Sequence, residues 1–231
     1  MMMLSIALAL LASTTAEALL DRSIAYHDPQ GRWSRGAFEI TELASQPDGT
    51  GHRNLLRFDN ARGRFELETS VDGRAVAVVV ENGVVVARLD GKANLDGDEL
   101  KRYRLTPAQV LSRRNRDLYL WGLPMKLRDP GTRLDPTVKE AVFEGQAVYQ
   151  LRVTYDEAVG SDTWYFFLDR DTCALVGHRF HHNGAQGDGE YAVFSGEVSG
   201  EGLRLPRVRK WYRNKDKKPL ITHTVLSIGT P

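Results

Sequence analysis

The sequence has only one cysteine and almost no net charge, and each scarcity excludes a class of protein. Cys173 is the single cysteine among 231 residues, so the chain can form neither an internal disulfide nor a zinc site built from several cysteines. The formal net charge is +1, which gives no bulk electrostatic attraction to nucleic acid. We therefore predict no nucleic-acid partner, and we expect Cys173 to be a packed thiol at the start of a strand.

The sequence also lacks the motifs that identify several common enzyme classes. The chain has no Walker loop, no G-x-G-x-x-G stretch and no G-x-S-x-G elbow, and Ser195 lies in FSGE without the first glycine of that elbow. We predict no cofactor, and we interpret the chain as a binding protein rather than an enzyme.

No apolar run is long enough to cross a bilayer, which needs about 20 apolar residues. Residues 1–18 read MMMLSIALALLASTTAEA, with a short apolar run at Leu4–Ala12 followed by small residues. This form predicts a secretory signal peptide over residues 1–18, a mature domain over residues 19–231, and a periplasmic or secreted protein. Against a signal peptide, no basic residue precedes the apolar run, and the first one is Arg22. No cysteine follows the apolar run directly, so a lipid anchor is not predicted. The alternative is an ordinary N-terminal helix that packs on the domain.

The sequence is rich in patterns that are typical of antiparallel β-strands and hairpins. Arg64–Val71 alternates apolar and polar residues cleanly, as a half-buried strand does, and Asn82-Gly83 is a strong signal for a type I′ hairpin turn. We predict a mainly β, α+β domain with about eleven strands. The expected strands are 36–44, 52–59, 64–71, 75–81, 84–89, 148–155, 163–168, 174–182, 189–198, 203–213 and 220–228.

Two helices are predicted, one before the strands and one between them. Leu19–Tyr26 precedes the Pro29 and Gly31 that end helices. Thr106 is a good N-cap for a helix that ends at Trp121, before Gly122. The Pro- and Gly-rich segment 123–136 is expected to be an ordered loop.

The segment Thr163–His182, TWYFFLDRDTCALVGHRFHH, is expected to organise the sheet. Its first strand is apolar on both faces, so both faces need cover. Asp169–Thr172 forms the turn, because Asp and Thr side chains bond the local backbone.

A strand, an LDRDT turn and a strand beginning Ala174-Leu175-Val176 resemble the curved sheet of LolA/LolB-like periplasmic lipid carriers. The blocks YHDPQGRW, LYLWGLPMKLRDPGT, GDGEYAVFSGEV and RKWYRNKD further resemble an uncharacterised family of exported bacterial proteins with that fold. The resemblance implies a curved antiparallel sheet that forms an incomplete barrel, with both helices on its concave face. It implies no catalytic residues, and fold similarity does not fix function.

If the fold is an open half-barrel, part of the concave face is left for a hydrophobic or lipid-like ligand. We expect the lining to consist of large apolar side chains, namely Trp121, Trp164, Phe166, Leu168 and Phe180. An alternative is a structural or interaction protein in which the same residues complete a solid core.

A second alternative is a metal-assisted hydrolase that uses the hairpin from His181 to Glu190, which also holds His182 and Asp188. No metal-ligand spacing motif is matched there, so we favour a polar hairpin end and predict no metal site. His27-Asp28 could form an acid/base pair, but Asp before Pro favours a structural turn.

Basic residues gather near the C-terminal end of the chain. They are Arg204, Arg207, Arg209, Lys210, Arg213, Lys215, Lys217 and Lys218. The functional interpretation is peripheral contact with an anionic membrane surface, and the alternative is a solvated sheet edge protected by charge. The oligomeric state is not predicted.

Overall fold

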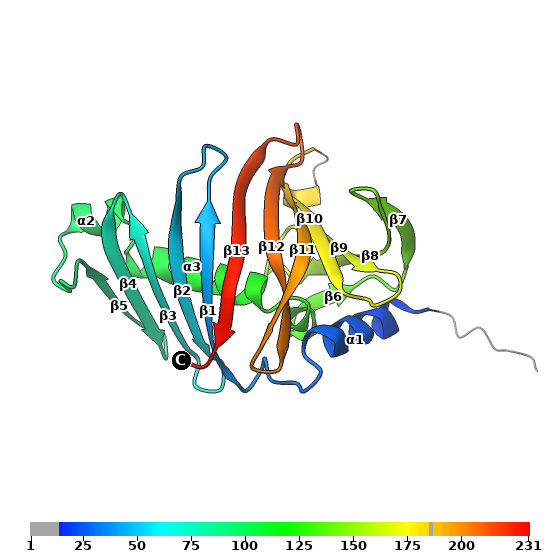
Figure 1. Cartoon of the computed structure of the whole chain (residues 1–231), viewed down its shortest axis with the longest axis horizontal. Coiled ribbons are helices and arrows are strands. Elements are labelled where there is room, and N and C mark those ends of the chain that lie inside the picture. The colour runs from blue at the N-terminus through cyan, green and yellow to red at the C-terminus, as the bar shows by residue number, and fades with distance from the viewer. Residues whose placement is uncertain (1–13, 185–186) are drawn as a thin grey trace, which may run out of the picture.

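A computed structural model describes residues 14–184 and 187–231. The described chain folds into one open antiparallel sheet of 13 strands that curves around two helices (Figure 1). The strand order is β5-β4-β3-β2-β1-β13-β12-β11-β10-β9-β8-β6, and β7 pairs with β8 off this path. No helix in the described ranges has the length and apolarity needed to cross a membrane.

The first part of the chain contains α1 (Ala16–His27), β1 (Ala37–Ser45), β2 (Gly51–Asp59), β3 (Arg64–Val71), β4 (Arg74–Glu81), β5 (Val84–Leu89), α2 (Gly97–Arg102) and α3 (Pro107–Trp121). The second part contains η1 (Met125–Arg128), β6 (Thr132–Leu134), β7 (Lys139–Phe143), β8 (Gln146–Tyr155), β9 (Thr163–Asp169), β10 (Leu175–His181), η2 (His182–Gly184), β11 (Glu190–Gly200), β12 (Leu203–Arg213) and β13 (Pro219–Gly229).

The turns form for the predicted chemical reasons. The Asp169 carboxylate accepts hydrogen bonds from the backbone N–H groups of Asp171 and Thr172, at 3.1 and 2.8 Å. Asn82 and Gly83 both have positive φ, as a type I′ turn requires. Cys173 is fully buried, as expected of a packed thiol, and burial raises its pKa.

The strand count of about eleven was too low, because the sheet has 13 strands. Part of the segment expected to be a loop, 123–136, pairs with β8 as β6, and β7 adds a second short strand. The short helix α2 was also missed, although Asp96 and Glu99 form a capping box at its start. The first helix starts at Ala16 rather than Leu19, so it includes the last residues of the predicted signal peptide, most of which lies outside the described residues.

Two hydrophobic clusters fill the concave face. The first joins α3 to β1–β5, with Phe58 and Phe65 fully buried beside Val110 and Trp121. The second joins α1 to β8–β12, with Leu19 and Leu20 packed against Leu151 and Phe166. The middle helix therefore covers one half of the sheet and the N-terminal helix the other.

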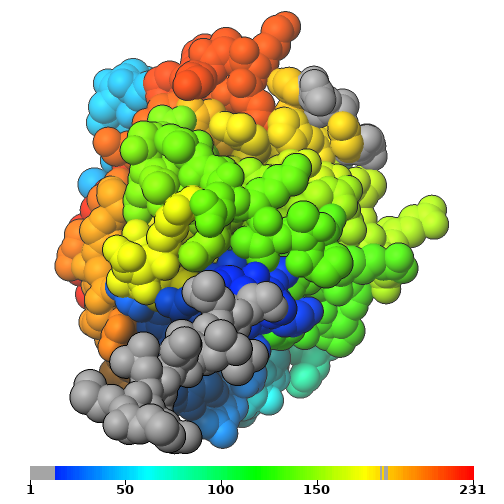
Figure 2. All heavy atoms as spheres, turned by 90° about the vertical axis from the view of Figure 1, so that its right-hand side faces the viewer, coloured from blue at the N-terminus to red at the C-terminus, as the bar shows by residue number. Residues whose placement is uncertain are grey.

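Helix α1 is fixed to the sheet by His27. Its Nε2 accepts a hydrogen bond from the backbone N–H of Leu175 at 2.9 Å, and its Nδ1 lies 2.6 Å from the carbonyl oxygen of Arg204. Both ring nitrogens are satisfied in a buried site, and burial lowers the pKa of His27 to about 4. The structural interpretation of His27 is thus supported. Figure 2 shows this end of the molecule, where α1 (blue) lies against the green residues that follow α3.

The outer face differs between the two halves of the sheet. Over β8–β11 it is covered by β7, whose Phe143 stacks on Phe167 at 3.9 Å between ring centroids. The predicted cover on both faces of β9 is therefore present. The sequence of β5, Val84–Leu89, is also apolar on both faces over Val84–Ala87, which would call for cover on both, but its outer face meets solvent: Val84 is 65% exposed and Val86 40% exposed. β5 is an end strand of the sheet.

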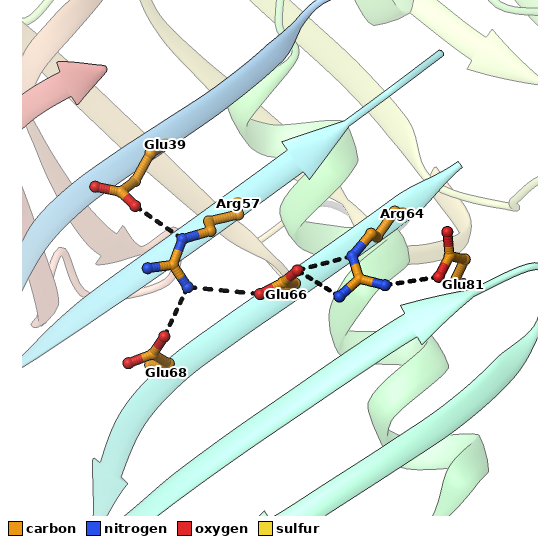
Figure 3. A network of polar contacts seen from close by, with 6 residues as sticks. All are labelled: Glu39, Arg57, Arg64, Glu66, Glu68 and Glu81. Atoms are coloured by element: carbon orange, nitrogen blue, oxygen red, sulfur yellow. Dashed lines mark hydrogen bonds and ion pairs between the residues drawn. The ribbon is translucent and has the colours of Figure 1, made fainter. Parts of the chain in front are cut away.

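The outer face of β1–β4 carries an ion-pair network (Figure 3). Arg57 bonds Glu39 at 2.8 Å, Glu68 at 2.6 Å and Glu66 at 3.5 Å. Arg64 extends the network by bonding Glu66 at 2.7 Å and also Glu81. These residues alternate with buried apolar side chains of the same strands, which explains why they point away from the core.

Candidate functional site

A row of polar side chains crosses the concave face between the two hydrophobic clusters. It comes from neighbouring strands of the sheet and consists of Asn54 (β2), Glu42 (β1), His223 (β13), Arg209 (β12) and His178 (β10). We call it the transverse polar row. All but His223 are less than 9% exposed. Burying polar groups costs free energy unless they are hydrogen-bonded, so the partners of each group matter.

Glu42 is fully satisfied. Its carboxylate accepts hydrogen bonds from Asn54 Nδ2 at 2.8 Å and from His223 Nδ1 at 2.7 Å. Burial acts to raise the pKa of Glu42, but the bonds from His223 and Asn54 outweigh it and hold the pKa below its usual value. Glu42 is thus a buried carboxylate that stays ionised.

Arg209 is buried and makes one hydrogen bond to the described residues. Its Nη1 donates to the carbonyl oxygen of Leu120 at 2.7 Å, and its guanidinium lies 4.0 Å from the ring centroid of Trp121. Its Nε has no hydrogen-bond partner, and no carboxylate of the described residues lies within 4.0 Å of it. Burial lowers the pKa of Arg209 to about 9, and the charge of Glu42 opposes that shift.

His178 is completely buried, and neither ring nitrogen has a hydrogen-bond partner among the residues that the structure describes. Aromatic rings surround it: Trp211 lies 4.9 Å away, Trp164 5.1 Å and Phe194 5.3 Å between ring centroids. Burial lowers the pKa of His178 to about 3, with a further contribution from the nearby charge of Arg209. The ring is therefore neutral and carries one N–H that no group of the described chain accepts.

An aromatic surface begins beside His178 and reaches solvent. Phe180 stacks on Trp164 at 4.6 Å, and Tyr119 of α3 meets Trp164 edge-on at 5.4 Å. Trp164, Phe180 and Trp211 are all only partly buried. The hydroxyl groups of Tyr119 and Tyr155 bond each other, which satisfies both within this apolar environment. Apolar side chains with solvent access thus lie next to unpartnered polar groups.

The five predicted lining residues lie on the concave face, but they are not equivalent. Trp164, Phe166 and Phe180 pack together, and Trp121 lies against Arg209. Phe166 and Leu168 are at most 1% exposed in the cluster that includes α1, whereas Trp164 and Phe180 retain accessible surface.

The hairpin residues of the hydrolase alternative do not converge. His182 pairs with Asp162 at 3.0 Å, and this bond raises its pKa. Glu190 is half-buried on the concave side, where burial raises its pKa. Within residues 14–184 and 187–231, no three His, Cys, Asp or Glu side chains are close enough to share a metal ion.

The predicted basic cluster is only partly a surface feature. Arg209 points into the concave face and is 4% exposed, so including it in a membrane-contacting patch was wrong. The reason is the alternation of β12, which places Arg209 and Trp211 on one side and the exposed Lys210 on the other.

The transverse polar row was missed by sequence reasoning, although a signal was present. In β1 the alternation puts Glu42 on the same face as Phe38 and Ile40, and a charged residue in an apolar register is unusual. In β10 the same argument joins His178 to Phe180. What the sequence could not show is that these strands lie side by side.

Comparison with known proteins agrees with the fold. The chain is similar to a LolA superfamily protein from Nitrosomonas europaea, with 10% identity, a TM-score of 0.57, and coverage of 95% of this chain and 94% of that one. It is also similar to a domain from Vibrio parahaemolyticus described as an outer membrane lipoprotein-sorting protein domain, with 14% identity, a TM-score of 0.50, and coverage of 92% and 89%. At these identities the likeness shows a LolA-like fold and no more. A search of curated proteins finds no match.

One sequence family accounts for nearly the whole chain. The profile of the family of unknown function DUF6503 matches residues 2–227. With its open, curved antiparallel sheet and two covering helices, the chain belongs to the DUF6503 family and has a LolA-like fold.

Proposed function

We propose that this protein is an exported carrier that holds a hydrophobic or lipid-like molecule on the concave face of its half-barrel. The observation that supports this most is the partly exposed aromatic surface of Trp164, Phe180 and Trp211 beside buried polar groups without partners. A filled structural core would bury its aromatic rings and pair its polar groups. A carrier instead needs apolar surface with solvent access and a few polar groups for orientation.

The five predicted lining residues receive different roles in this proposal. Trp164 and Phe180 contact the ligand first, because they keep accessible surface. Phe166 and Leu168 form the wall beneath them, and Trp121 closes the side formed by α3. The outer membrane lipoprotein-sorting description of the Vibrio structure is consistent with a lipid-like ligand here.

Native mass spectrometry of freshly purified protein is the first test. The proposal predicts added masses that correspond to bound amphiphiles and that disappear after organic extraction. Binding of a fluorescent hydrophobic probe should then fall in Phe180→Ala and remain unchanged in Val86→Ala, which trims an exposed apolar side chain on the outer face. No added mass together with no probe binding would contradict the carrier function.

Export is the second part of the proposal. The intact mass of protein from the periplasmic fraction should lack the first 16 to 18 residues. Recovery of only full-length protein from the cytoplasm would contradict it.

The basic residues of the β12–β13 turn, Lys215, Lys217 and Lys218, are exposed and are proposed to contact anionic membrane surface. Sedimentation with anionic but not with neutral vesicles would support that contact.

A further inference from the structure

We propose that Arg209 and His178 form a subsite for the anionic headgroup of an acyl-chain amphiphile, whose apolar tail lies along Trp164 and Phe180. This inference rests on the proposed carrier function and specifies its ligand class. Two observations support it: Arg209 and His178 have donors without partners among the described residues, and the apolar surface of Trp164 and Phe180 lies next to them.

Arg209 supplies a positive charge that the fold leaves largely uncompensated. The two carboxylate oxygens of Glu42, the nearest opposing charge, already accept hydrogen bonds from Asn54 and His223. Among the described residues, Arg209 donates only from Nη1, to the carbonyl oxygen of Leu120. A planar guanidinium with free donors matches a carboxylate or phosphate.

His178 and Arg209 share an aromatic neighbour on the concave face. Both side chains pack against the ring of Phe194, with the guanidinium carbon 5.2 Å and the imidazole centroid 5.3 Å from the ring centroid. A neutral imidazole has one N–H to donate. An anionic headgroup near Phe194 would accept from both residues and would remove the cost of burying them without partners.

The apolar part of the ligand can lie on the rings of Trp164 and Phe180. From His178 the rings of Trp164 and Phe180 continue along β9 and β10 as stacked, partly accessible surface. An acyl chain on these rings is continuous with a headgroup at Arg209. A ligand with charge at one end and hydrocarbon at the other therefore fits both features at once.

The experiment compares the binding of palmitate, palmitoyl lysophosphatidate and the neutral monopalmitoyl glycerol to the full chain, by displacement of a fluorescent hydrophobic probe. We expect at least one anionic amphiphile to bind about tenfold more tightly than the neutral one, as charge-assisted hydrogen bonds allow. Arg209→Gln should abolish this preference while leaving the neutral amphiphile almost unaffected. The control Lys210→Gln removes a neighbouring positive charge from the exposed side of the same strand and should retain the preference.

Each outcome decides a different point. Equal binding of charged and neutral amphiphiles by the wild type overturns the anionic subsite and leaves the carrier function standing. Binding of none of them overturns both. Preference for only one of the anions supports the subsite and identifies its headgroup as carboxylate or phosphate. If Arg209→Gln does not fold, Arg209→Lys replaces it: a reduced preference supports the subsite, and an unchanged preference counts against the guanidinium.

Discussion

The two halves of the sheet differ in how their outer faces are covered. In the half formed by β1–β5, the concave face is dry and the outer face carries a solvent-accessible ion-pair network around Arg57. In the half formed by β8–β12, α1 covers much of the concave face and β7 covers the outer face of β8–β11, while Trp164, Phe180 and Trp211 keep solvent access. The transverse polar row lies where the two halves meet. The second half therefore has packed side chains on both faces of the sheet next to the aromatic surface to which we assign ligand binding.

The largest expected effect comes from opening the outer face of the β8–β12 half. Phe167 is 4% exposed and stacks on Phe143. Phe167→Ala should lower the free energy of unfolding by about 3 to 5 kcal/mol, because it leaves a cavity under β7. Denaturant unfolding measures this loss. A change below about 1 kcal/mol would show that the outer cover contributes little to stability.

Acid should weaken the same half. His27 and His178 have pKa values of about 4 and about 3 in the folded protein, both lowered mainly by burial. Below an unfolded pKa of about 6.5 the unfolded state binds more protons than the folded state, so stability falls with decreasing pH. Each histidine should contribute a slope of up to about 1.4 kcal/mol per pH unit down to its folded pKa.

The pH dependence of the unfolding free energy between about pH 6.5 and about pH 4.5 checks this expectation, since the whole window lies between the folded and unfolded pKa values. His178→Phe should flatten the slope, whereas His182→Gln, at an exposed histidine, should not. An unchanged slope in His178→Phe would mean that this ring is not buried in its neutral form.

A smaller loss of stability is expected from a substitution in β10 where this strand packs against β7. A Cβ at Gly177 would lie 2.5 Å from the carbonyl oxygen of Ala192, and it would also clash with the Phe143 ring. Gly177→Ala should therefore cost about 1 to 3 kcal/mol of stability. Gly160→Ala, where a Cβ meets no atom within 4 Å, is the matched control and should be nearly neutral in thermal melting.

The smallest effect should come from the outer face of the β1–β5 half. Arg57 is 26% exposed in its side chain and pairs with three glutamates. Arg57→Ala should cost about 1 kcal/mol or less at low ionic strength and still less in high salt, because exposed ion pairs are weak and screened. A salt-independent loss comparable to that of Phe167→Ala would remove the contrast between the halves.

The elements that are bounded by clear turn residues were predictable from sequence. β3, β5 and β12 have the predicted bounds, because alternation and turn residues define them locally. Helix α3 begins after Thr106 as expected, although that hydroxyl bonds the Gln109 side chain rather than the backbone. β6 and β7 were missed because they are short and are specified by pairing with β8, which is a tertiary property.

The candidate site was less predictable, for a physical reason. Its aromatic residues stand out by size, so Trp164 and Phe180 could be named in advance. The polar partners come from strands that are distant in sequence, as with Glu42 and His223. Burial of Arg209 depends on which face of β12 turns inward, and the charge-rich sequence around it favoured a surface interpretation. Only the assembled sheet shows that these residues form one row.

The most direct test of ligand binding on the concave face uses the four tryptophans, Trp33, Trp121, Trp164 and Trp211. Two proteins are needed, each with a single tryptophan and with phenylalanine in place of the other three, so that the aromatic surface is kept; one retains Trp164 and the other retains the buried Trp33 that stacks on Phe38. A brominated fatty acid, which quenches tryptophans that it contacts, is titrated into each. We predict strong saturable quenching of Trp164 and little quenching of Trp33. Equal quenching of both, or quenching of neither, would contradict binding at this surface.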